Sequence, residues 1–229
     1  METARSGYPG TGPGDITPDG CAVELYRRLP VDNEPAIVVD AFPPPASLLE
    51  LGCGAGRLTR PLSALGYAVT AVDESAAMLA HVTGATRIVR SPVEGLALGE
   101  AYDVVLLASF LVNAPDPEVR RALLATCLRH VAPAGVVVIQ REGDDWATAR
   151  TSFERPMLDG TARIESTEND PDGVRSLRAE YAFPDATWTQ TFRSRSLPGP
   201  EFERALAESG LRLDRYLDDE RLWAAARPL

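Results

Sequence analysis

The stretch Ser47-Leu-Leu-Glu-Leu-Gly-Cys-Gly-Ala-Gly56 is an apolar run that breaks into three glycines at alternate positions. Seventeen residues after Gly56, Asp73 ends a second apolar run, Ala68–Val72. Glycines after a strand permit a tight turn into a helix, and a carboxylate ending the next strand can accept hydrogen bonds from ribose hydroxyls. The two features together predict a binding site for a nucleoside-bearing cofactor.

Short apolar runs alternate with helical stretches through the middle of the chain. The expected strands are Ala46–Leu51, Ala68–Val72, Thr86–Val89, Tyr102–Ala108 and Val136–Gln140, and the expected helices are Gly56–Leu65, Ser75–Val82 and Pro117–Val131. The last helix is well marked, because Asp116 can serve as its N-cap and Pro117 occupies its first position. Regular alternation of this kind indicates an α/β fold with a doubly wound parallel sheet.

The pattern changes after Gln140. Three runs separated by turn residues predict an antiparallel meander: Ala162–Glu168, Val174–Phe183 and Thr187–Ser196. A helix over Pro200–Ser209 and two strands, Leu211–Leu217 and Leu222–Ala226, are expected to follow.

The chain is expected to form a single domain over residues 1–229. Its predicted parts are an N-terminal arm with helices that acts as a lid (1–45), a cofactor-binding core (46–150), the meander as a substrate cover (151–196) and a closing helix with strands (197–229). Residues 1 to about 20 are rich in Gly, Pro and Thr, which predicts a mobile arm.

An acidic residue directly ahead of Gly-x-Gly-x-Gly, here Glu50 before Gly52, Gly54 and Gly56, resembles the first motif of class I S-adenosylmethionine (SAM)-dependent methyltransferases. The resemblance covers roughly residues 36–150 and the C-terminal stretch. It implies a Rossmann-like seven-stranded sheet whose last strand is antiparallel, with the meander inserted before the closing helix and hairpin. It also implies SAM as cofactor, S-adenosylhomocysteine (SAH) as product, and methyl transfer by in-line displacement.

The resemblance places the cofactor along the ends of the predicted strands. Glu50 would orient the glycine turn and the amino end of SAM, Asp73 would accept both ribose hydroxyls, and Arg57 would pair with the SAM carboxylate. Met78 would pack on adenine, and Val93 or Glu94 would contact its edge. The full predicted cofactor set is Glu50, Gly52, Gly54, Gly56, Arg57, Asp73, Glu74, Met78, Val93, Glu94 and Ala108.

The acceptor is expected at the ends of the fourth and fifth strands. Its predicted contacts are Phe110, Asn113, Arg141 and Trp146. Glu142 is the candidate general base, and Tyr26 on the N-terminal helix is a candidate to reach over SAM. Asp103, at the start of a strand, is expected to be structural, and neither His81 nor His130 falls at a strand end.

Composition limits the possible partners. The formal net charge of −10 repels nucleic acid and anionic lipid, so a small-molecule acceptor is expected, with the protein monomeric or homodimeric. The three cysteines lack metal spacing and only two histidines are present, so we expect reduced thiols and no metal. The N-terminus lacks the pattern of a signal peptide and no apolar run is long enough to span a membrane, which predicts a cytoplasmic protein.

Other functional classes stay open. A nicotinamide-dependent oxidoreductase would use Gly-x-Gly-x-x-Gly, whereas Arg57 follows Gly56 here. A SAM-binding protein without transfer activity, or an interaction module that uses the meander as an edge, is not distinguished by sequence.

Overall fold

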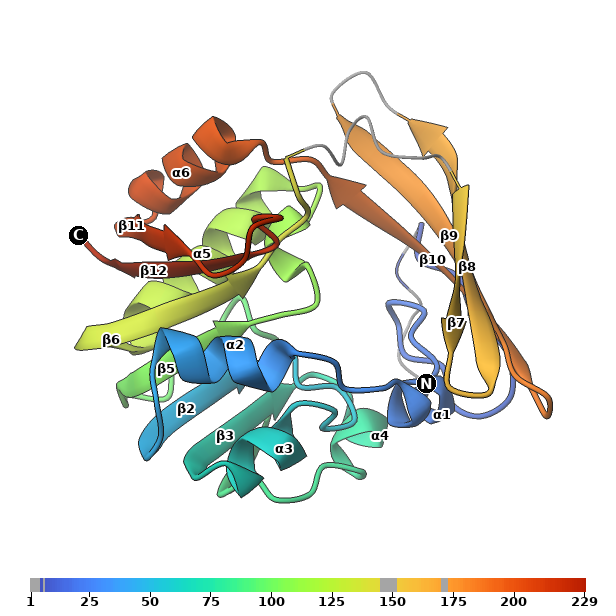
Figure 1. Cartoon of the computed structure of the whole chain (residues 1–229), viewed down its shortest axis with the longest axis horizontal. Coiled ribbons are helices and arrows are strands. Elements are labelled where there is room, and N and C mark those ends of the chain that lie inside the picture. Colours follow the sequence, from blue (N-terminus) through green and yellow to red (C-terminus); the bar gives the residue numbers. More distant parts are fainter. Residues whose placement is uncertain (1–4, 6, 145–151, 170–172) are drawn as a thin grey trace. The chain divides into compact units, whose positions relative to one another are not determined.

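The computed structural model describes residues 5, 7–144, 152–169 and 173–229. The chain divides into two compact units (Figure 1). One consists of Met1–Pro30 with Ala147–Arg195, and the other of Val31–Trp146 with Ser196–Leu229.

The larger unit is built on a seven-stranded sheet of order β11-β12-β6-β5-β2-β3-β4. Its strands are β2 (Ala46–Leu51), β3 (Tyr67–Asp73), β4 (Arg87–Arg90), β5 (Tyr102–Leu107), β6 (Val131–Gln140), β11 (Leu211–Tyr216) and β12 (Trp223–Pro228). The five strands from β6 to β4 are parallel, and only β12 runs antiparallel to its neighbours. The predicted doubly wound sheet with an antiparallel last strand is confirmed.

Helices cover both faces of this sheet. Successive residues of a strand point to opposite faces, so the apolar strands present side chains to be buried on each face. Leu49 and Leu51 share a buried cluster with side chains of α5 (Pro117–His130) and α6 (Gly199–Glu208). Leu48 belongs to a second cluster with α2 (Glu34–Ala41) and α3 (Thr59–Ala64). The central strands are therefore buried on both sides, as their continuous apolar sequence predicts.

Several boundaries differ from those predicted, and two of the differences have a clear structural cause. The helix expected from Gly56 begins at Thr59, since Gly56 has a φ of +83° that ends the turn before any helix can start. Strand β6 begins at Val131 instead of Val136, because Tyr102 pairs with Val131 before the register shifts and Val104 pairs with Val136. The predicted N-cap of α5 is confirmed, since the Asp116 carboxylate accepts a hydrogen bond from the Glu118 N–H at 2.8 Å.

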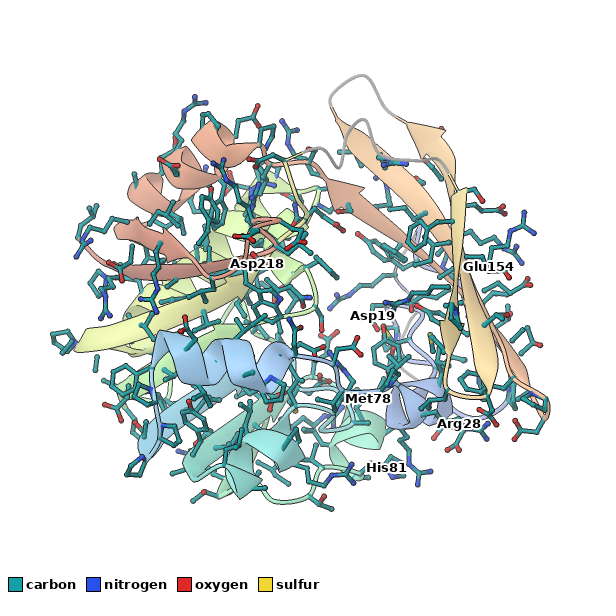
Figure 2. The ribbon with its side chains drawn as sticks, viewed as in Figure 1. Asp19, Arg28, Met78, His81, Glu154 and Asp218 are labelled. Carbon is teal, nitrogen blue, oxygen red and sulfur yellow. The ribbon has the colours of Figure 1, made fainter. Side chains whose placement is uncertain are left out.

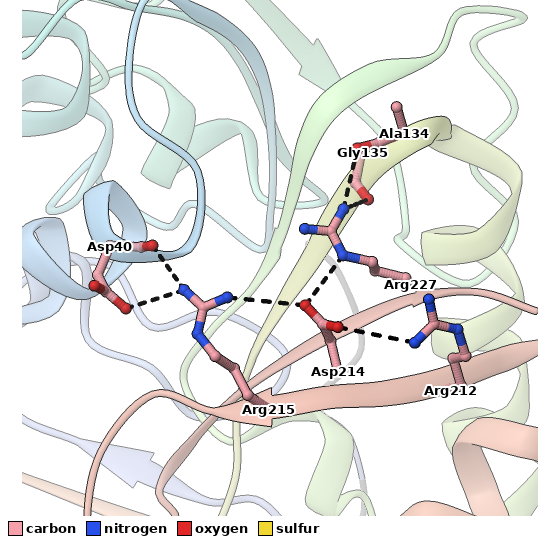
Figure 3. Close-up of polar contacts among 7 residues, drawn as sticks. All are labelled: Asp40, Ala134, Gly135, Arg212, Asp214, Arg215 and Arg227. Atoms are coloured by element: carbon pink, nitrogen blue, oxygen red, sulfur yellow. Dashed lines mark hydrogen bonds and ion pairs between the residues drawn. The ribbon is translucent and has the colours of Figure 1, made fainter.

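The edge of the sheet carries a charged bulge (Figure 3). The register of β11 and β12 shifts around Asp214, whose carboxylate faces Arg212, Arg215 and Arg227 at 3.8, 3.8 and 3.1 Å. Arg227 also donates to the carbonyls of Ala134 and Gly135, while Arg215 pairs with Asp40 of α2. A bulged edge lined with charge is a poor template for further strand pairing.

The smaller unit is a five-stranded antiparallel sheet of order β1-β10-β9-β8-β7. Its elements are β1 (Gly10–Thr11), α1 (Val23–Arg28), β7 (Ser152–Met157), β8 (Gly160–Asn169), β9 (Val174–Ala182) and β10 (Thr187–Arg195). The predicted meander is confirmed, with β1 and β7 as additional strands that the sequence analysis missed. The N-terminal segment is part of this sheet, because β1 pairs with β10 and the Trp188 indole donates to the Pro13 carbonyl at 2.9 Å.

Candidate cofactor site

The glycine turn follows β2 in the larger unit. Gly52, Gly54 and Gly56 have φ values of +71°, +54° and +83°, a region that side chains rarely adopt. A Cβ atom on Gly52 would lie 2.9 Å from Leu111 Cδ1, and one on Gly56 would lie 3.1 Å from Val82 Cα. The backbone therefore closes tightly at this turn, and no side chain of the three glycines covers it.

Asp73 ties the glycine turn to the next strand. One carboxylate oxygen accepts the Gly54 N–H and the other accepts the Ser75 N–H, both at 2.8 Å. Ser75 itself caps α4 (Ala76–Leu79) by accepting the Met78 N–H at 3.2 Å. Because each carboxylate oxygen has a second lone pair, the half-buried Asp73 can also accept a ribose hydroxyl.

Glu50 is buried under the turn at 3% exposure. The Thr59 hydroxyl donates to its carboxylate at 2.5 Å. Burial raises the pKa of Glu50 to about 7, against the opposing effects of the Thr59 hydrogen bond and the Arg57 charge. A carboxyl group poised in this way becomes ionised more readily when a cation approaches.

Arg57 is held by a partner that the sequence analysis did not identify. Its guanidinium pairs with Glu34, the first residue of α2, at 2.5 Å. The second Glu34 oxygen accepts the Asp32 N–H at 2.7 Å, so both side chains are fixed. The predicted contact of Arg57 with the SAM carboxylate stays a prediction.

The predicted adenine contacts lie on two segments at the same edge of the sheet. Met78 on α4 is buried, and Figure 2 shows it and His81 in this part of the unit. Glu74 is half-buried, and its carbonyl accepts Arg90 Nε at 3.0 Å. Val93 and Glu94, also half-buried, lie in the segment between β4 and β5.

The end of β5 adopts an unusual backbone conformation. Ala108 is buried, and the next two residues, Ser109 and Phe110, have φ values of +56° and +59°. The Ser109 N–H donates to the Gln140 side chain at the end of β6, at 2.8 Å. Such conformations are costly outside glycine and are found where the surroundings hold them, often at functional sites.

The predicted acceptor contact Asn113 and the candidate general base Glu142 lie together. Asn113, in the short 3-10 helix η1 (Leu111–Asn113), is 1% exposed, and its side-chain oxygen accepts the Glu142 N–H at 2.9 Å. This bond links the segments that follow β5 and β6. Glu142 is itself buried, so little of its side chain is exposed to solvent at this edge of the sheet.

Arg141 differs from the expectation in its surroundings. Its side chain is fully buried, donating to the carbonyls of Leu197 and Arg221 at 2.5 and 2.9 Å and pairing with Asp144 at 2.7 Å. These partners indicate a structural role for Arg141, and its predicted contact with the acceptor stays a prediction. The predicted acceptor contact Trp146 lies outside the described residues.

Tyr26 belongs to the smaller unit. Its hydroxyl donates to the Gln190 side chain and accepts from the Cys21 thiol, both at 3.2 Å. Burial raises the pKa of Tyr26 well above its usual value. Because these partners lie in its own unit, the catalytic role of Tyr26 stays a prediction.

Sequence reasoning missed Thr59 and Glu34, the partners of Glu50 and Arg57. Neither residue stands at a sequence spacing that would mark it as part of the site, because each contact depends on where α2 and α3 pack. Asp103 was predicted to be structural, and it accepts the Ser47 N–H and hydroxyl at 2.8 and 2.7 Å at the opposite edge of the sheet.

A Rossmann-like sheet with an antiparallel last strand, a left-handed glycine turn after the central strand, and a carboxylate ending the next strand define a class I SAM-dependent methyltransferase. A family model described as "Methyltransferase domain" matches residues 25–215, and the chain belongs to this family. SAM is the methyl donor of these enzymes and SAH their product. Family membership removes the nicotinamide-dependent oxidoreductase from the alternatives.

The curated relatives match a smaller part of this chain than the solved structures do. The chain is 35% identical over 101 residues to a ubiquinone biosynthesis O-methyltransferase from Caulobacter sp. strain K31, covering 40% of this chain and 39% of that protein. The chain thus spans about two fifths of the length of the curated relatives it matches.

Two solved structures cover most of the chain. A SAM-dependent methyltransferase from Clostridium acetobutylicum has a TM-score of 0.71 and 15% identity, covering 90% of this chain and 96% of that one. A SAM-bound amino pentose methyltransferase of calicheamicin biosynthesis from Micromonospora echinaspora has a TM-score of 0.70 and 22% identity, covering 90% and 95%. At these identities the likeness supports the fold.

Within the part of the chain that the structure describes, no helix is both long and apolar enough to cross a membrane.

Proposed function

We propose that this chain transfers the methyl group of SAM to a nitrogen, oxygen or electron-rich carbon of a small molecule. The observation that carries the proposal is the joining of the glycine turn to Asp73 through the Gly54 N–H at 2.8 Å. This joint lies beside the point where strand order reverses, between β2 and β5, and ligands of open α/β sheets bind outside the carboxyl ends of strands at that point.

The residues present fit SAM. Left-handed glycines leave room for the ribose and methionine portions, where a Cβ at Gly52 would meet Leu111 instead. Asp73 can accept ribose hydroxyls, and the Glu50 carboxylate complements a cationic ligand without a phosphate. The predicted cofactor set Glu50, Gly52, Gly54, Gly56, Arg57, Asp73, Glu74, Met78, Val93, Glu94 and Ala108 is retained as our proposal.

SAM supplies an activated methyl group on a sulfonium, so the protein has mainly to bind and orient. Holding two reactants in line can contribute roughly 7–11 kcal/mol to lowering a barrier. For a hydroxyl acceptor, Glu142 would accept the proton that the acceptor loses, whereas an amine has only to arrive neutral. Phe110 and Asn113 would hold the acceptor at the end of β5.

We infer that the acceptor is a flat or ring-shaped metabolite. Phe110 is 37% exposed at the carboxyl end of β5, which offers an apolar surface to such a ring. Similar proteins include an amino pentose methyltransferase and a ubiquinone biosynthesis O-methyltransferase, so amino-sugar nitrogens and phenolic oxygens are the first classes to test, followed by indoles.

The proposal is tested by incubating the protein with SAM carrying a labelled methyl group and a panel of amino sugars, catechols, phenols and indoles. We expect labelled product and an equal amount of SAH with one class. The function is wrong if calorimetry detects neither SAM nor SAH binding. Binding without product across the panel would favour a SAM-binding protein that lacks transfer activity.

A further inference from the structure

The C-terminal half of α5 holds the backbone that follows β4. The Thr126 hydroxyl donates to the Val93 carbonyl at 2.9 Å and lies 3.2 Å from the Glu94 carbonyl. The Arg129 guanidinium donates to the Leu96 carbonyl at 2.6 Å. Together with His130, these side chains form what we call the α5 clamp: Thr126, Arg129 and His130.

His130 completes the clamp with a defined tautomer. Its Nε2 lies 3.1 Å from the Leu98 N–H, and its Nδ1 lies 2.8 Å from the Thr126 carbonyl. A backbone N–H only donates and a carbonyl only accepts, so Nε2 must be the acceptor and Nδ1 must carry the proton. The ring closes the last turn of α5 and fixes the segment beside it.

Two of the three clamp residues are internal, whereas Arg129 is exposed. Thr126 and His130 have 0% exposure, and Leu96 of the held segment is 3% exposed within the adjacent core. Four backbone groups of the segment, the carbonyls of residues 93, 94 and 96 and the N–H of residue 98, have partners on α5. If one of these side chains is removed, the buried backbone group that it bonded keeps neither a protein partner nor water. The arrangement is therefore strongly specified.

We propose that the α5 clamp positions Val93 and Glu94 to recognise the adenine base of the cofactor, and that it acts through this segment and not by direct contact with the base. This inference rests on the proposed function, because it assigns a task to the segment that the SAM site requires. The clamp residues are positioning residues. They set how well the site distinguishes the 6-amino group of adenine from other bases.

The experiment uses Thr126→Val, which removes the hydroxyl and nearly keeps the volume, and Thr126→Ser, which keeps the hydroxyl. Thr70→Val is the matched control, since Thr70 is also buried but lies on β3, where its hydroxyl accepts a hydrogen bond from the Tyr102 hydroxyl at 3.3 Å. Calorimetry measures Kd for SAH and for S-inosylhomocysteine, in which an oxygen replaces the 6-amino group.

For the wild type we expect tighter binding of SAH than of the inosyl analogue. In Thr126→Val, the SAH affinity should fall by about 3- to 10-fold while the analogue changes little, because one hydrogen bond to the base is misplaced. Thr126→Ser should restore the preference, and the KM for SAM should rise without a matching loss of kcat.

A preference for SAH that is equal in the wild type, Thr126→Val and Thr70→Val would overturn the inference while leaving the proposed function in place. If Thr126→Val does not fold, Arg129→Met gives the same test, since it removes the donor to the Leu96 carbonyl from an exposed position of α5. A wild type that binds neither ligand would overturn the proposed function instead, and the inference with it.

Discussion

The carboxyl ends of β2 and β3 differ from the carboxyl end of β6 in what holds them. At β2 and β3, backbone N–H groups of Gly54 and Ser75 converge on one carboxylate, and glycines supply the turn. At β6, one buried guanidinium gathers carbonyls from segments 56 and 80 residues away, at Leu197 and Arg221. The first arrangement leaves room for a ligand, whereas the second closes the fold.

The largest expected effect comes from removing the guanidinium at β6. Arg141→Met should destabilise the protein by about 3–5 kcal/mol, because it leaves the carbonyls of Leu197 and Arg221 without their donor and breaks the ion pair with the partly exposed Asp144. Chemical denaturation measures the free energy of unfolding. SAM affinity should change little in the fraction that folds.

Arg221→Met is the control. Arg221 also pairs with Asp144, at 3.0 Å, but its side chain is 54% exposed, so about 1 kcal/mol or less is expected. If Arg141→Met were as stable as this control and instead raised KM for the acceptor, Arg141 would be the substrate contact that the sequence suggests.

The two strand ends also show why only one was predictable. The glycine turn and Asp73 are neighbours in the sequence pattern, and the conformation of each follows from its own residue type. In the sequence, Arg141 looks like any polar residue that follows a strand. Its partners, the carbonyls of Leu197 and Arg221, belong to segments much later in the sequence that pack against it only in the fold. A sequence shows residue types and spacing, but it does not show which distant carbonyls a side chain will meet.

The second prediction concerns Asp73. Asp73→Ala should weaken SAM binding by about 100-fold, since charge-assisted hydrogen bonds contribute on the order of 1.5–3 kcal/mol each and the turn also loses its tie to β3. Isothermal titration calorimetry, carried out below the unfolding temperature, gives the Kd.

Asp103→Ala separates ligand contact from stability. Asp103 also accepts a backbone N–H at a strand end, at 2.8 Å from Ser47, but at the amino edge of the sheet. Its substitution should lower the unfolding free energy without changing the Kd for SAM. Equal losses of SAM affinity in both variants would mean that Asp73 acts only through the stability of the sheet.

The same contrast between pattern and packing applies across the fold. The strands of the large sheet follow from their apolar runs, whereas β7, with its Pro156 and charged residues, has exposed side chains up to Met157 and gave no strand signal. The α5 clamp was also missed, because His130 at the end of a helix looks the same whether it faces solvent or a neighbouring loop.

The last prediction concerns the pH dependence that Glu50 confers, since its burial distinguishes it from the half-exposed Asp73. Its pKa of about 7 lies above its ordinary value of 4.5, so the folded protein holds a proton that the unfolded chain releases between these values. Stability without cofactor should therefore fall as pH rises from about 4.5 to 7, by at most about 1.4 kcal/mol per pH unit, and then level off. Glu50→Gln cannot ionise, so this part of the slope should disappear from its denaturation curves.

SAM, as a cation, favours the ionised carboxylate, and its affinity for the wild type should rise through pH 7 while that of Glu50→Gln stays flat. The same slope in both proteins would show that another group titrates, and Glu50 would then be a buried support of the turn with no electrostatic role toward the cofactor.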